Sequence, residues 1–217
     1  MLKIYLSLTF FLIYFDLTGQ NIEVAGGLNK NDFYDYGSPS TVHFLSRYYP
    51  GSGYFLAVSV DHIIDSLPFK FTLKIDNYKG NLFTTDGSLG GGSSTTAEVD
   101  KLNIGLDAYP VNLNLSDWFE INVGISFSYL LHEKMKGHQS SWQINTTGHT
   151  ISLDDNSINT KFNFGLIARF TPKIAIGNRL SLLPQYLFYY ELTDEFRNEA
   201  DSKSYRHYFG IGIMKKI

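Results

Sequence analysis

The chain has no cysteine, only six prolines and two tryptophans, and few charged residues (18%) for its 217 residues. Without cysteine it can form neither a disulfide framework nor a thiol-based active site. The formal net charge is −3, whereas a protein that binds nucleic acid presents a basic face. Composition therefore argues against nucleic acid as a partner, and the length suits one domain.

Residues 1–20 have the pattern of an export signal. Lys3 supplies the positive charge, Ile4 to Phe15 is almost unbroken apolar, and Gly19-Gln20 ends a short polar exit. The apolar run is shorter than the roughly 20 residues of a spanning helix, although an N-terminal anchor is the alternative. We predict a signal peptide over 1–20 and a mature domain over 21–217.

Trp118 to Leu131 shows the pattern that the rest of the chain repeats. Its odd-numbered residues from Phe119 onward are apolar, and the even-numbered ones from Glu120 to Ser128 are small or polar. Successive side chains of a strand point to opposite faces, so this segment has one apolar and one polar face. It is also longer than the five or six residues usual in soluble proteins, and a tilted strand that crosses a membrane needs roughly 9–11.

The same alternation predicts eight strands joined by connections that are long and short in turn. The predicted strands are 21–28, 54–63, 69–79, 98–109, 118–131, 159–171, 179–192 and 205–217. The predicted long, polar connections are 29–53, 80–97, 132–158 and 193–204. Pro110 should end the regular strand or mark a bulge, because proline cannot donate to a strand ladder. Long loops at one end and short turns at the other are typical of bacterial outer-membrane barrels.

Alternation alone does not distinguish a soluble barrel from a membrane barrel, because the apolar face points inward in one and outward in the other. The second face is rich in small residues, whereas a soluble surface would favour long charged side chains. These small residues are Ala25, Gly27, Ala57, Ser59, Gly105, Gly124, Ser126, Ser128, Gly165, Gly210 and Gly212. We therefore predict an all-β fold, an eight-stranded antiparallel up-and-down transmembrane β-barrel with long external loops and short periplasmic turns.

Charged residues on the second face are of both signs, and buried charges are stable only when paired and hydrogen-bonded. We predict a lumen charge network that fills the barrel and leaves no stable channel. Its members are Glu23, Asp61, Lys70, Lys74, Asp76, Lys101, Asp107, Glu120, Lys161, Arg169, Arg179, Glu191 and Arg206. Aromatic residues near strand ends suit interfacial girdles. They are Tyr54, Phe69, Tyr109, Trp118, Tyr129, Phe170, Tyr190 and Tyr205.

The leader ending in Gly19-Gln20, a first strand IEVAGGLN and eight amphipathic strands together resemble a known family. The chain is similar to the outer-membrane β-barrel domain proteins of Bacteroidota, the PorT-like group of small barrels. The resemblance implies a Gram-negative outer-membrane location and a role beside secretion or envelope machinery. One departure is the C-terminus, which ends in Ile217 rather than in the Phe common among outer-membrane barrels.

Signals for catalysis or metal binding are weak. His132, His138 and His149 have no zinc or metalloprotease spacing, and the Gly-rich stretch near residue 90 lacks the lysine of a phosphate-binding loop. Ser59, Asp61 and His62 are the residue types of a Ser-His-Asp catalytic triad. Neighbouring residues of a strand point to opposite faces, however, so Asp61 and His62 are not expected to share a site. We expect no enzymatic activity, no cofactor and no metal.

The predicted function is that of a non-catalytic integral barrel of the cell outer membrane. Its partners would be outer-membrane lipid and a protein bound through the external loops or the periplasmic side. Two alternatives are an outer-membrane lipid-modifying enzyme, for which His62 and His207 are the outward polar candidates, and a secreted lipocalin-like barrel that binds an apolar ligand.

Overall fold

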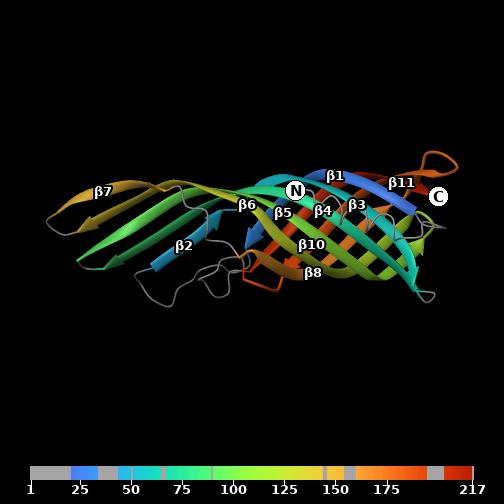
Figure 1. The fold of residues 1–217 in the computed structure, drawn as a ribbon, viewed down its shortest axis with the longest axis horizontal. Coiled ribbons are helices and arrows are strands. Elements are labelled where there is room, and N and C mark those ends of the chain that lie inside the picture. The colour runs from blue at the N-terminus through green and yellow to red at the C-terminus, as the bar shows by residue number, and fades with distance from the viewer. Residues whose placement is uncertain are drawn as a thin grey trace, which may run out of the picture.

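Eight antiparallel strands pair edge to edge and close into a ring (Figure 1). The computed structural model describes residues 21–33, 44–49, 51–64, 67–88, 90–143, 146–153, 160–194 and 203–216. The ring strands are β1 (Asn21–Phe33), β3 (Ser52–Ile64), β4 (Leu67–Ser88), β5 (Gly91–Ser116), β6 (Phe119–Gln143), β8 (Phe162–Pro172), β10 (Leu180–Glu191) and β11 (Ser204–Lys216). Each neighbour in sequence is also a neighbour in space, and β11 pairs with both β10 and β1. The predicted all-β, eight-stranded up-and-down barrel is confirmed.

Three shorter strands attach to this ring. β2 (Phe44–Tyr49) pairs with β4, β7 (Thr146–Leu153) pairs with β6, and β9 (Ile174–Ala175) pairs with β10. The predicted signal peptide over 1–20 lies outside the described residues. No helix in the described part of the chain is long and apolar enough to cross a membrane.

Three ring strands are about twice as long as the others. β4, β5 and β6 have 22, 26 and 25 residues, whereas β1, β3, β8, β10 and β11 have 11 to 13. Their extra length forms, with β2 and β7, a five-stranded sheet that continues past the barrel on the left of Figure 1. We call this sheet the extension.

The structure corrects three predicted loops. The loops 80–97 and 132–158 are largely strand, and 29–53 contains the end of β1 and all of β2. Pairing of β4 with β5 runs without a register shift from Lys70↔Tyr109 to Ser88↔Gly91. Thr and Ser line these strands on both faces, so the apolar alternation that marks a half-buried strand is missing, although threonine is favoured in strands. Cross-strand hydrogen bonding with a neighbour continues the sheet where the apolar pattern stops.

Pro110 lies at a bulge, as predicted. The pairing of β5 with β6 shifts register between Ala108 and Val111, and β5 then continues to Ser116. An extra residue in one strand moves the following side chains to the other face, which accounts for the change of apolar phase after Tyr109. Short connections join β3 to β4 and β5 to β6 at the same end, where Asn21 and Lys216 also lie opposite each other.

A glycine pair brings β1 and β11 close together where the ring closes. Gly27 lies opposite Gly210, and a Cβ added at Gly27 would be 2.1 Å from the backbone oxygen of Phe209. At neighbouring Gly26 an added Cβ would meet the flexible end of Leu56 at 2.9 Å. The Cβ at Gly26 would also lie 3.3 Å from the Phe55 backbone oxygen, whereas the much closer approach at Gly27 is to backbone that cannot move without separating the strands.

We predict that Gly27→Ala lowers the free energy of unfolding by about 1–3 kcal/mol, the usual cost of overpacking. Gly26→Ala is the matched control and should cost less. Urea unfolding of the refolded protein, followed by tryptophan fluorescence, measures both. Equal effects of the two substitutions would show that the approach of β1 to β11 is not tight at this point.

Candidate functional site

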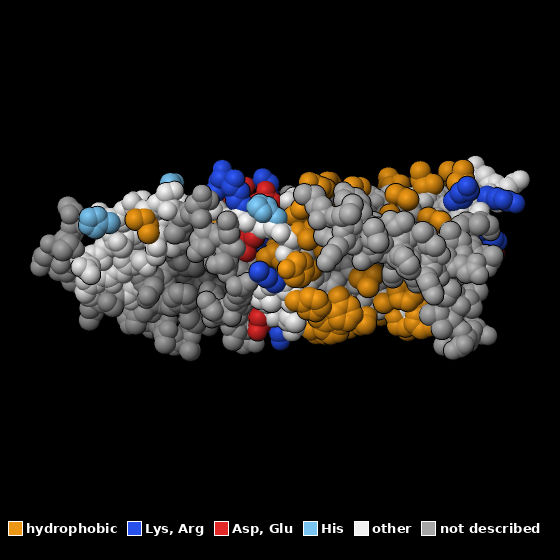
Figure 2. Space-filling view, in the orientation of Figure 1, with side chains coloured by type: hydrophobic (Ala, Val, Ile, Leu, Met, Phe, Trp, Pro, Cys, Tyr) orange, Lys and Arg blue, Asp and Glu red, His pale blue; other side chains and the backbone are white. Residues whose placement is uncertain are grey.

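The outer face of the barrel is an apolar band (Figure 2). On β8 the outward residues run from Phe162 to Phe170, and on β10 from Leu180 to Tyr190. Both rows match the roughly 9–11 residues that a tilted strand needs to cross hydrocarbon. Exposed members of the band include Val24, Leu28, Tyr54, Leu56, Val58, Leu106, Val123, Phe127, Tyr129, Leu166, Phe209, Ile211 and Ile213.

Charges replace the apolar residues where the extension begins. Lys79 on β4 lies 3.5 Å from Glu98 and 3.5 Å from Asp100 on β5. The Asp100 carboxylate, and after it Glu98, raises the pKa of the Lys79 ammonium above its usual value. The apolar band therefore ends at an exposed cluster of both signs on the side of the extension.

The lumen of the barrel holds most of the residues that the sequence analysis assigned to it. Ten of the thirteen are buried: Glu23, Lys70, Lys74, Asp76, Lys101, Asp107, Glu120, Arg169, Glu191 and Arg206. Asp61 is half-buried, with a side-chain exposure of 33%. Strand alternation brings these residues together, because each of them occupies an inward position of its strand.

A first cluster surrounds Lys70 near the short turns. The Lys70 ammonium lies 3.2 Å from Glu120, 3.3 Å from Asp61 and 3.6 Å from Glu23. Arg169, on β8, donates to Glu23 at 2.5 Å across the barrel. Ion pairs in the interior thereby connect β4 with β1, β3 and β6, and connect β1 with β8.

Sequence reasoning missed two charged residues that belong with the interior, the half-buried Lys173 and the buried Glu133. Lys173 follows β8 in a short turn and reaches back to Glu120 at 2.5 Å. Glu133 lies on β6 in the segment predicted as a loop, is buried, and stands opposite Lys101 in the β5–β6 register. Lys173 lies in a turn, where side chains do not alternate. For Glu133, the register shift between Leu102 and Asn103 changes the alternation of β6, so the sequence pattern did not indicate an inward position for either residue.

The second cluster lies one step further along β4. The Lys74 ammonium is 3.1 Å from Asp107, and the Ser126 hydroxyl donates to the same carboxylate at 2.5 Å. Lys74 also lies 4.7 Å from the centre of the Tyr208 ring, within reach of a cation–π interaction. Both ions are nearly inaccessible to solvent, so removing one of them would leave a buried, unpaired charge and lower the stability of the barrel.

The third cluster surrounds Arg206 on β11, toward the extension. Its guanidinium lies 3.6 Å from Asp76 and 3.7 Å from Glu191, and it donates to the Tyr78 hydroxyl at 3.1 Å. Ser204 donates to Glu191 as well. Among the described residues, six buried carboxylates thus share the interior with five buried cations.

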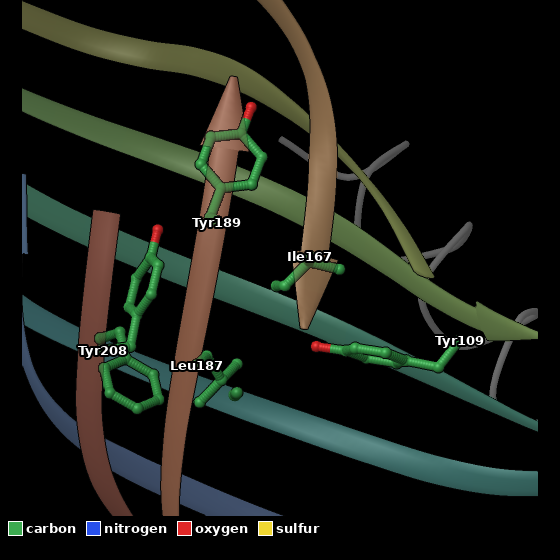
Figure 3. Packing of buried hydrophobic residues seen from close by; sticks show 7 residues of the cluster. Tyr109, Ile167, Leu187, Tyr189 and Tyr208 are labelled. Atoms are coloured by element: carbon green, nitrogen blue, oxygen red, sulfur yellow. The ribbon is translucent and has the colours of Figure 1, made fainter. Parts of the chain in front are cut away.

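Aromatic and aliphatic side chains fill the space between these clusters, which the sequence analysis did not anticipate (Figure 3). Figure 3 shows Tyr109, Ile167, Leu187, Tyr189 and Tyr208 gathered among the strands of the ring, and they belong to one buried cluster. Phe55 packs edge-on against Tyr208, with ring centres 5.3 Å apart. Tyr109 is fully buried, so its predicted place in an outer girdle was wrong: it occupies the inward row of β5 before the bulge.

The prediction that Lys161 and Arg179 belong to the lumen network was wrong, because both side chains are exposed. Lys161 immediately precedes β8, and Arg179 immediately precedes β10, so each lies at a strand end where the inward row is not yet established. Both cations therefore lie at the edges of the apolar band rather than inside the barrel.

The histidines form no site in the described part of the chain. His132, His138 and His149 are exposed, and the side chain of His62 lies outside the described residues. Ser59 is buried and hydrogen-bonds Thr72 at 2.8 Å, while Asp61 binds Lys70. His207 faces outward and bonds the Tyr186 hydroxyl at 2.7 Å within an aromatic group. These contacts describe packing rather than a catalytic triad.

No family model matches this sequence, and no curated protein matches it. Among solved structures it is similar to Neisserial surface protein A, NspA (9% identity, TM-score 0.44, 92% of this chain and 98% of that chain covered). It is also similar to the outer membrane protein OprG from Pseudomonas aeruginosa (9% identity, TM-score 0.42, 92% and 97% covered). A third is Ail, the attachment invasion locus protein of Yersinia pestis, in complex with a heparin analogue (8% identity, TM-score 0.37, 91% and 99% covered). At such identities and scores these likenesses settle neither family nor activity, and the fold rests on the strand pairing described above.

We predict that Lys74→Met lowers the free energy of unfolding by about 3–5 kcal/mol, because it leaves the Asp107 carboxylate buried without its cation. Adding Asp107→Asn should recover part of that loss, which a double-mutant cycle in urea measures. Lys161→Met is the matched control, and since Lys161 is exposed it should change the free energy within error. Equal effects of Lys74→Met and Lys161→Met would contradict an ion-paired interior.

Proposed function

We propose that the protein is an integral barrel of the bacterial outer membrane that neither conducts nor catalyses and that presents a surface to a partner. The observation that carries the proposal is the division of the strands into an outward apolar row and an inward ion-paired row. Hydrocarbon accepts the first row, and a closed ring satisfies the backbone of every strand without water. The reverse arrangement would suit a soluble lipocalin-like barrel.

The extension is the element that supports a surface role. It continues the barrel beyond the charged cluster of Lys79, Glu98 and Asp100, and its exposed side chains include Trp142 and Ile151. A five-stranded sheet of this length is more than a barrel needs to cross a membrane. We propose that it projects outside the cell and binds a protein partner, with secretion or envelope machinery of the PorT-like type as the candidate assembly.

The alternative of a lipid-modifying enzyme has less support. Such an enzyme needs a reactive side chain and a base or acid at the outer rim. His207, the described outward histidine of the barrel wall, bonds Tyr186 and stacks against aromatic rings rather than facing a carboxylate. We therefore propose a non-catalytic role, and an unchanged lipid profile in a deletion strain is the expected result.

We predict that the purified protein forms no steady channel in planar lipid bilayers. The side chains that meet in the interior, among them Tyr109, Arg169 and Arg206, are at most 2% exposed and leave little room for a column of water. Current recordings at both voltage polarities test this directly. Large, steady single-channel currents from the wild-type barrel would contradict a closed lumen.

The orientation can be tested by single-cysteine labelling, because the chain has no cysteine of its own. Gly90 and Gly177 lie in turns at opposite ends of the molecule, and an added Cβ at either meets nothing within 4 Å. In intact Gram-negative cells, a membrane-impermeant maleimide should label Gly90→Cys. Gly177→Cys should react only after the outer membrane is permeabilised. The opposite pattern would place the extension in the periplasm.

A further inference from the structure

An apolar groove with a basic rim lies on the outer wall of the barrel at the end opposite the extension. It has a volume of about 590 Å³ and is formed where β10, β11 and β1 meet. Its lining residues are Ile22, Val24, Arg179, Leu180, Ile213, Lys215 and Lys216. Basic side chains also gather beyond the apolar band at this end of Figure 2.

The walls of the groove belong to the apolar band. Val24, Leu180 and Ile213 are 56%, 42% and 52% exposed, and they come from three adjacent strands. Leu182 stands opposite Ile213, and Ile213 stands opposite Val24, so the aliphatic groups form a continuous strip. A strip of this kind at the edge of the band suits the upper part of an acyl chain.

The rim of the groove carries three cations that the barrel interior does not neutralise. Register places Lys215 between Leu180 and Ile22, and the backbone N–H of Lys216 donates to the Arg179 carbonyl at 2.9 Å. No carboxylate of the described residues lies within ion-pair distance of Arg179, Lys215 or Lys216, and none lines the groove. By contrast Lys173, at the same end, is bound to Glu120.

The other end of the barrel shows what a balanced rim looks like. A polar groove of about 510 Å³ there is lined by Lys30, Lys79 and Glu98 among others. Lys79 lies 3.5 Å from Glu98 and 3.5 Å from Asp100, so its charge is already matched. Of these two grooves, both lined by described residues, the one at the short-turn end combines apolar walls with cations of one sign.

We propose that this groove binds an anionic glycerophospholipid of the periplasmic leaflet. The lipid phosphate would lie between Arg179, Lys215 and Lys216, with one acyl chain along Ile22, Val24, Leu180 and Ile213. A guanidinium binds phosphate through two parallel hydrogen bonds, and ammonium groups add charge that attracts anionic lipid. The inference rests on the proposed function, since it requires the apolar band to lie in a bilayer.

The test measures lipid retention by the full mature chain, folded in detergent. Phosphatidylglycerol and phosphatidylcholine of equal chain length are added in equal amounts, and bound lipid is counted by native mass spectrometry. Wild type should retain phosphatidylglycerol about tenfold over phosphatidylcholine. The triple variant R179Q/K215Q/K216Q should bind the two lipids equally. The matched control K30Q/K134Q/K136Q removes the same charge at the other end and should keep the preference.

A second variant separates the groove from its charge. Ile213→Trp fills the apolar wall, leaves the three cations in place, and should also lose the bound lipid. A preference unchanged in both R179Q/K215Q/K216Q and Ile213→Trp, or equally lost in the control, would overturn the proposal. Heat-modifiable migration in the same samples reports the barrel itself. A folded wild type without lipid preference refutes this inference alone, whereas failure to insert into micelles or vesicles refutes the proposed function.

Discussion

Closure of the sheet through β11 is the constraint on which the rest of the structure depends. β11 pairs with β10 on one side and with β1 on the other, so the ladder has no open edge around the ring. An open edge would leave unpaired backbone groups, which hydrocarbon does not tolerate. Closure also requires close approach of the end strands, and Gly27 opposite Gly210 supplies it. Every inward side chain must then share one enclosed volume.

That enclosed volume explains why the interior is both charged and aromatic. Because the apolar row of each strand faces outward, its polar row must face the interior. Ion pairs such as Lys74–Asp107 neutralise the charged side chains of these inward rows. The clusters around Lys70, Lys74 and Arg206 follow one another along the barrel, with Tyr109, Tyr189 and Tyr208 between them. Removing one ion would leave its partner charged and buried without a counter-ion, which is costly. The clusters therefore hold together strands that are far apart in the sequence.

The two ends of the barrel differ in chemistry. Toward the extension, Lys79, Glu98 and Asp100 form a cluster of both signs, and the sheet continues past it as β4, β5 and β6 with β2 and β7. At the short-turn end, Arg179 and its neighbours present one sign of charge beside apolar walls. A barrel in an asymmetric membrane meets different surroundings on its two sides, and this difference supports both proposals.

The sequence by itself determined the ring strands and the faces they present, because alternation is a local property of each strand. Phe162 to Phe170 and Leu180 to Tyr190 show the outward rows without any knowledge of their neighbours. Only the tertiary structure decided the remaining features. Register and pairing decided the strands of the extension and the inward position of Tyr109 before a bulge. They also decided the contact of Lys173 with Glu120 and the exposed positions of Lys161 and Arg179. Register is set by contacts between strands distant in the chain, so a side chain at a strand end, in a turn or beside a bulge has no local pattern that reveals its surroundings.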